Sequence, residues 1–390
     1  GLSVGNIGIG ASIAVVGVTT ANSNAIAGIV TVVATVDDSS ITFATTASSF
    51  HTLGAQADNA VAVQVDVTAT TGYLYLDGDY ENSNTGDTVN DVQFADAVRV
   101  AAETLMTLES TTGSIVPAAK LTLVAGSGVV VLDDMTTTAT NSALVMDVDF
   151  ESEGDGTLTV WAGKTVTSTK SDVTITAWDV EMDGSLTAGT LSISVHGAKT
   201  SQTIGIGASL SQNMEILDGE LGRLTAEAGL TIGTAVTGEI QVKGVIDGSS
   251  DSVGTITLVG MKDATAVAFL GTASAFNMGI VVQAMGGVVL SESVTTKNWP
   301  TLIYAGTGTL KTLSTKSLVS TNQLLTVTAD DVDLQGDLVD SGTALMVITP
   351  LTVANTIGLG DITFTEMDAG KAEVAVITTS GGLTIGSLAV

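Results

Sequence analysis

The chain has 390 residues, of which 41 are Asp or Glu and 12 are Lys or Arg, so its formal net charge at pH 7 is −29. Nucleic acid and anionic membrane surfaces both require a positive protein face, so this charge argues against either partner and favours cations. Apolar residues make up 44% of the chain and cysteine is absent, which excludes general disorder, disulfide frameworks, thiolate catalysis and Cys-based zinc sites.

Short segments that alternate apolar with polar residues recur along the chain, and this period of two is typical of strands with one buried face. In chain order they are residues 28–34, 60–67, 72–76, 120–126, 157–163, 172–184, 190–197, 238–244, 254–260 and 324–336. Gly, Asn, Asp and Ser lie between them, as expected for corners that need positive φ. Helical spacing is nearly absent. The segment from Thr365 is rich in helix formers, but its repeat partner from Asn213 is equally compatible with a strand and a turn.

The core must be built from small and β-branched side chains, because aromatic residues make up only 4% of the sequence. Stacked coils about 4.8 Å apart would place like residues over like residues in a narrow interior. We therefore expect Trp161, Trp178 and Trp299 to cover the core rather than line it.

The chain repeats itself. The pentapeptide GLSVG at Gly1 matches GLTIG at Gly229, which recurs at Gly382. The octapeptide at 43–50 likewise matches that at 269–276. We interpret residues 1–228 as a first copy, 229–381 as a second, shortened copy and 382–390 as the start of a third, in one continuous solenoid. The ends also suggest a mature or internal piece of a longer chain.

The second copy lacks roughly 75 residues but keeps the flanking register, which a solenoid tolerates because each coil touches only its neighbours. The sequence therefore predicts an all-β fold, a parallel β-helix rod built from imperfect repeats, with coils on the order of 20 to 25 residues. A string of β-sandwich domains is the alternative fold, but it would not survive that loss. We expect no membrane insertion, since both long uncharged stretches, 1–36 and 264–291, are interrupted by polar residues.

The segment DVTITAWDVEMDGSLTAGTLSISVHG at 172–197, together with TIGIG and GLTIG, resembles the repeats of giant secreted β-helix proteins. These are the filamentous-haemagglutinin-like adhesins of bacteria and comparable repeat proteins of marine algae. The resemblance covers nearly the whole chain, but the secretion domain of that family has no counterpart here. It implies an extracellular rod that adheres or forms a filament.

Two acidic segments echo each other 70 positions apart, DGDYENSNTGD at 77–87 and DVDFESEGDG at 147–156. They place carboxylates at alternate positions, a pattern that suits a hard cation with six to eight oxygen ligands. The candidate ligands of a structural Ca²⁺ are Asp77, Asp79, Glu81, Asp87, Asp147, Asp149, Glu151 and Asp155. A solvated acidic loop that keeps neighbouring rods apart is the alternative interpretation. No other cofactor is expected.

Adjacent carboxylates at Asp37–Asp38, Asp133–Asp134 and Asp330–Asp331 raise the question of glycoside hydrolysis, which uses a carboxylate pair. The chain has only two arginines and two histidines to support such a site, so we expect no catalytic residues and no enzyme activity. Changing Asp133 and Asp134 would test a polysaccharide-active enzyme, the least favoured function.

The favoured function is a structural protein, the shaft subunit of an extracellular filament or cell-surface appendage. Its partners would be further copies of itself or neighbouring fibre subunits. The alternative is the stalk of a cell-surface adhesin that binds cations, glycan or another surface ligand. The expected localisation in both cases is extracellular, at the cell surface or in a secreted filament.

Overall fold

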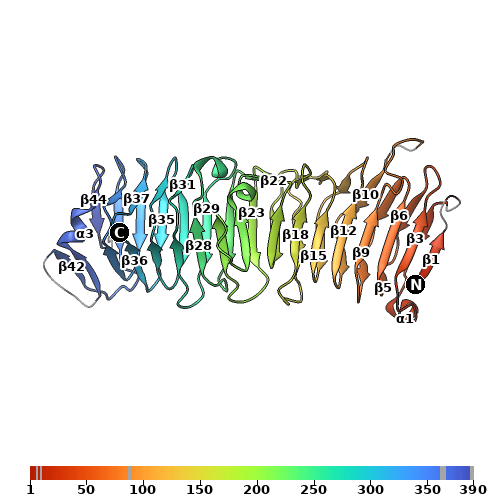
Figure 1. Cartoon of the computed structure of the whole chain (residues 1–390), viewed down its shortest axis with the longest axis horizontal. Helices are drawn as coiled ribbons and strands as arrows, with labels where there is room; N and C mark the ends of the chain where they lie inside the picture. The colour runs from red at the N-terminus through yellow and green to blue at the C-terminus, as the bar shows by residue number, and fades with distance from the viewer. Residues whose placement is uncertain (6–7, 9–10, 87–88, 361–365, 387–390) are drawn as a thin grey trace. The chain divides into compact units, whose positions relative to one another are not determined.

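The computed structural model describes residues 1–5, 8, 11–86, 89–360 and 366–386. The chain divides into two compact units, unit 1 from Gly1 to Ile193 and unit 2 from Ser194 to Val390. In each unit successive strands pair in parallel with the strands one coil before and one coil after them (Figure 1). The fold is therefore an all-β parallel β-helix, as the sequence predicts.

Unit 1 has three sheets, and a coil contributes one strand to each. Sheet I contains, in spatial order, β1 (Leu2–Gly5), β3 (Val30–Ala34), β6 (Leu53–Ala57), β9 (Leu74–Asp77), β12 (Leu105–Glu109), β15 (Gly128–Val131), β18 (Thr157–Val160) and β21 (Asp179–Met182). Sheet II contains β2 (Ile13–Val15), β4 (Ser40–Phe43), β7 (Ala60–Val63), β10 (Asp91–Phe94), β13 (Ile115–Pro117), β16 (Met135–Thr136), β19 (Thr165–Thr167) and β22 (Ser185–Gly189). Sheet III contains β5 (Ser48–Phe50), β8 (Val67–Ala69), β11 (Val98–Ala102), β14 (Leu121–Ala125), β17 (Leu144–Asp147) and β20 (Val173–Ala177).

The strands of unit 2 likewise lie in parallel sheets, and their parts within this unit are labelled IV to VI. Sheet IV contains β27 (Gly229–Thr234), β29 (Ile256–Gly260), β32 (Ile280–Ala284), β35 (Thr301–Tyr304), β38 (Leu325–Thr328), β41 (Met346–Thr349) and β45 (Leu383–Ile385). Sheet V contains β25 (Met214–Leu217), β24 (Ile204–Gly207), β28 (Ile240–Lys243), β30 (Val267–Phe269), β33 (Val288–Leu290), β36 (Thr309–Thr312) and β39 (Asp331–Leu334). Sheet VI contains β31 (Ser274–Phe276), β34 (Val294–Thr296), β37 (Ser317–Ser320), β40 (Leu338–Asp340) and β44 (Ile377–Thr378).

The remaining elements are short. They are the strands β23 (Ser192–Gly197), β26 (Leu224–Ala226), β42 (Ile357–Gly360) and β43 (Met367–Gly370), the helices α1 (Thr20–Ser23), α2 (Asp218–Leu221) and α3 (Lys371–Ala375), and the 3₁₀ turn η1 (Asp247–Ser250).

The core consists of stacked aliphatic ladders. In sheet I, Met106, Val129 and Leu158 follow one another in register on adjacent coils, and each is fully buried. Burial alternates along the strands, as the period of two predicts. Phe43 and Phe50 fill the first coils, with ring centroids 6.3 Å apart in an edge-to-face arrangement.

The three tryptophans do not line the core. Trp161 is 55% exposed, Trp299 is 56% exposed and Trp178 is half-buried. The prediction that they lie outside the aliphatic interior is confirmed.

The number of residues per coil varies, and several coils exceed the expected 20 to 25 residues. In sheet I the step from Leu53 to its partner Leu74 takes 21 residues, but the step from Leu74 to Met106 takes 32. The longest step in sheet IV runs from Met346 to Leu383 and takes 37. The extra residues form loops and short helices between the strands.

Repeat copies share local geometry. β24 pairs in parallel with β25, and β42 pairs with β43 in the same register 153 positions later. A short helix follows each pair, α2 in one case and α3 in the other. The segments 214–221 and 367–375 are therefore each a strand followed by one helical turn, and Thr365 lies outside the described residues.

Candidate functional site

The two acidic segments form loops that lengthen their coils. The first acidic loop, of which the structure describes residues 77–86, follows β9, and the second acidic loop, residues 147–156, lies between β17 and β18. The second accounts for the 29-residue step from Val129 to Leu158, where the following step to Val180 takes 22.

Asp79 ties the first acidic loop to the neighbouring coil. Its side chain is fully buried, Oδ1 accepts the N–H of Ser83 at 3.1 Å, and Oδ2 accepts the N–H of Thr112 at 2.6 Å. The first bond closes the loop on itself and the second reaches the turn that follows β12. Such charge-assisted bonds compensate the desolvation of a buried carboxylate.

Asp77 lies in a polar row across three coils on the outer side of sheet I. Its register partners are Gln56 on β6 and Glu109 on β12. Oδ1 accepts the N–H of Asp79 at 3.0 Å, and Oδ2 accepts the amide of Gln56 and the hydroxyl of Tyr75, each at 3.2 Å. The Tyr75 hydroxyl also lies 2.6 Å from Oε2 of Glu109 and is shared between the two carboxylates.

This row perturbs the ionisation of its members. Burial, helped by the charge of Glu109 and opposed by the hydrogen bonds, raises the pKa of Asp77 to about 6. Burial, followed by the hydrogen bond to Glu109, also raises the pKa of Tyr75. The tyrosine therefore stays neutral and acts as a donor.

The second acidic loop uses the same turn. Asp149 is fully buried and accepts the N–H of Gly154, at 3.2 Å to Oδ2. The carboxylate of Glu151 lies against Gly126, because a Cβ added there would lie 2.2 Å from both carboxylate oxygens. Burial raises the pKa of Glu151, and the charges of Glu103, Asp155 and Asp149 act in the same direction.

The two acidic loops occupy different corners of the β-helix. The first follows a strand of sheet I, whereas the second follows a strand of sheet III. The 70-residue echo is therefore not a whole number of coils. Consequently the carboxylates of the two loops do not stack along one edge.

The other four predicted calcium ligands differ in exposure. Glu81 and Asp155 are exposed, Asp147 is the half-buried last residue of β17, and Asp87 lies outside the described residues. Within the described ranges, no group of three or more Asp, Glu or His side chains is arranged to hold a metal ion. The calcium site stays a prediction.

The carboxylate pairs are engaged in structural contacts. Asp133 is buried, accepts the N–H of Ser110 at 2.7 Å and pairs with Nζ of Lys164 at 2.6 Å. Asp330 accepts the N–H and hydroxyl of Thr352 at 2.7 and 2.6 Å. These contacts hold adjacent coils together.

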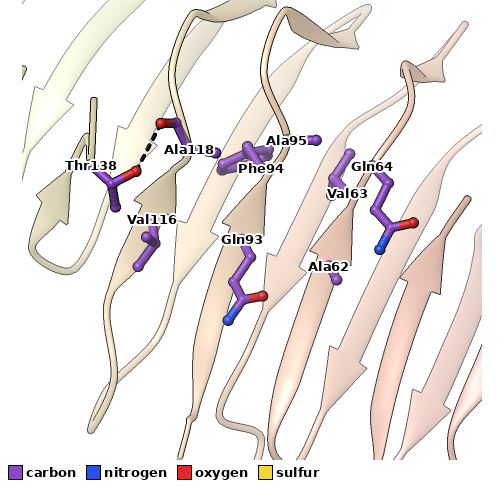
Figure 2. Close-up of a pocket in the computed structure, with 9 residues that line it drawn as sticks. All are labelled: Ala62, Val63, Gln64, Gln93, Phe94, Ala95, Val116, Ala118 and Thr138. Atoms are coloured by element: carbon purple, nitrogen blue, oxygen red, sulfur yellow. Dashed lines mark hydrogen bonds between the residues drawn. The ribbon is translucent and has the colours of Figure 1, made fainter. Parts of the chain in front are cut away.

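A shallow groove crosses the outer face of sheet II (Figure 2). Its floor is formed by small residues such as Ala62 and Ala118, Gln64 and Gln93 lie beside it, and the hydroxyl of Thr138 donates to the carbonyl of Ala118 at 2.8 Å. No charged side chain lines it.

Sequence reasoning missed Gln56, Tyr75, Glu103 and Glu109 as neighbours of the acidic loops. Tyr75 is two positions from Asp77 on the same strand, whereas Gln56, Glu109 and Glu103 lie on other coils, 21 to 48 positions away in sequence. Only the coil register, which varies between steps, brings them together.

No family model matches the chain, and no curated protein or solved structure is detectably similar to it. Among the helices that the structure describes, none has the length and apolar character needed to cross a bilayer.

Proposed function

We propose that this protein is a structural element, the shaft subunit of an extracellular filament or cell-surface appendage built from stacked β-helix coils. The observation that carries this proposal is the pairing pattern: among the described residues the strands of each unit pair in parallel, and apart from the β24–β25 and β42–β43 pairs each sheet advances one coil at a time. A coil of this kind needs only the coils above and below it, so length can change without a new core.

The repeated module supports elongation by duplication. The same strand pair and helical turn occur at 204–221 and, among the described residues, at 357–360 and 367–375. β1 and β45 are each the last strand of their sheet among the described residues, so the outer edge of each can pair with a further coil of the same or another polypeptide.

The extracellular placement rests on the resemblance to filamentous-haemagglutinin-like adhesins and to the comparable algal repeat proteins. It is part of the proposal. A net charge of −29 favours a rod that stays soluble among its neighbours.

A chain with one added module tests the proposal. A second copy of residues 204–356 inserted after Thr356 should lengthen the particle by roughly 25–30 Å, about six steps of 4.8 Å, at unchanged cross-section. Small-angle scattering of the two chains measures both quantities, and electron microscopy of the native material should show filaments. Growth in all dimensions, or compact particles, would reject the shaft.

An adhesin stalk is the second candidate, and the acidic loops and the charge-free groove of Figure 2 are the observations that favour it. Cell-binding or glycan-array assays with and without chelator separate it from a pure shaft. Absence of binding under both conditions would count against the stalk.

A further inference from the structure

Sheet IV has an outer face without charge. Its outward residues form two rows in register across the coils, here called the neutral face: Thr231, Thr257, Val281, Leu302, Thr326, Val347 and Thr384 in one row, and Val259, Gln283, Tyr304, Thr328 and Thr349 in the other. None of the seven strands carries a charged residue. The other two long sheets of unit 2 do, at Lys243, Asp333 and Asp340 among others.

The neutral face is partly apolar and hollowed. Leu302 is 41% exposed, and a shallow groove of about 270 Å³ lies beside it. Val281, Gln283, Tyr304, Thr326 and Thr328 line the groove. Exposed apolar patches next to a hollow are typical of protein contact sites.

The charge of the chain limits what can cover this face. Two copies, each with a net charge of −29, repel each other over most of their surface. A basic partner would be drawn to the acidic faces instead. The neutral face is a surface on which a second copy can approach with little local repulsion.

We propose that the neutral face is a lateral contact between two copies of this chain, which rests on the proposed filament function. A two-fold arrangement would place Leu302 of each copy against the groove of the other. Seven strands about 4.8 Å apart, each about 15 Å long, offer roughly 400–500 Å² per copy, which is at the weak end of specific interfaces. Between two parallel filaments the same weak contact would recur along the length, so the total binding free energy would increase with the number of contacts.

Sedimentation velocity of the full chain tests this contact. Raising the salt from about 0.05 to 1 M shortens the Debye length from above 10 Å to about 3 Å, so self-association should increase. The variant Leu302→Asp places a charge in the contact and should weaken association at 1 M salt at least about tenfold. The matched control Val289→Asp, a half-buried outward position on β33, should associate as the parent does.

Circular dichroism confirms that both variants fold. A parent chain that stays monomeric at high salt, or a Leu302→Asp variant that associates like the parent, overturns the lateral contact. A second outcome would also overturn the lateral contact: the parent chain binds a neutral polysaccharide but does not self-associate, and Leu302→Asp no longer binds the polysaccharide. The neutral face would then be a glycan-binding surface. Single unbundled filaments in microscopy would overturn it while leaving the shaft function standing, whereas compact particles would remove the function itself.

Discussion

Buried aspartates organise one corner of unit 1. Asp58, Asp79 and Asp133 are each at most 4% exposed. Each accepts a backbone N–H, from Asp38 at 2.9 Å, Thr112 at 2.6 Å and Ser110 at 2.7 Å respectively. These acids, which in sequence look like solvated corner residues, are hydrogen-bonded parts of the stack.

Asp77 should make stability depend on pH. Its folded-state pKa of about 6 lies above its ordinary value of 3.8, so the folded chain binds this proton more tightly than the unfolded chain. The stabilisation is complete below about pH 3.8 and is lost as the pH rises through 6. Between pH 5 and 7.5 we expect a loss of about 1–2 kcal/mol in the free energy of unfolding from this group.

The variant Asp77→Asn should flatten that pH dependence, because an amide cannot lose the proton. Urea unfolding followed by circular dichroism at the two pH values measures it. Asp183→Asn, at an exposed position, serves as control and should keep the parent slope. An unchanged slope in Asp77→Asn would contradict the assignment.

At the scale of elements, residues whose backbone has a positive φ form corners of the β-helix. Thr45 and Gly271 occupy equivalent turns in the two repeat copies, with φ of 67° and 71°. In each turn the next residue donates its N–H to the preceding carbonyl at 2.7 Å. The backbone turn is therefore the repeated feature, and the residue type is not.

Asn322 is a corner whose side chain also joins two coils. Its φ is 54°, and its Oδ1 accepts the N–H and hydroxyl of Thr343 at 3.0 and 3.2 Å. Asn322→Ala should cost about 1–3 kcal/mol, because it removes both bonds and disfavours the positive φ. Asn322→Gly keeps the backbone freedom and should cost less. Thermal denaturation compares them, and equal losses would show that only the bonds matter.

At the scale of the whole molecule, charge repulsion opposes folding. With 41 acidic and 12 basic residues, the chain should unfold at a higher temperature as the NaCl concentration is raised, because salt screens the repulsion.

If the acidic loops bind calcium, CaCl₂ at the same ionic strength should raise the midpoint of thermal unfolding further. Glu81→Gln with Asp155→Asn, both exposed, should remove that additional rise. Equal unfolding temperatures in NaCl and CaCl₂ would show that the salts act by charge screening and that the acidic loops do not bind calcium.

The sequence by itself determined the strand pattern, the parallel β-helix and the place of the tryptophans outside the core. It could do so because alternation and repetition are local, and the copies at Gly1, Gly229 and Gly382 show that one kind of segment is stacked many times. The turn at Thr45 and the strand pair at 204–217 follow the same rule, since each recurs in the second copy.

Only the tertiary structure decided which side chains meet. Coil steps among the described strands vary from 19 to 38 residues, so no fixed period places Glu109 beside Asp77, Gly126 beneath Glu151 or the two acidic loops at different corners. The neutral face likewise depends on register, because its two rows collect residues from seven separate strands. The length of each loop fixes which residues of neighbouring coils lie in register. These contacts therefore exist only in the folded chain and cannot be read from a local sequence pattern.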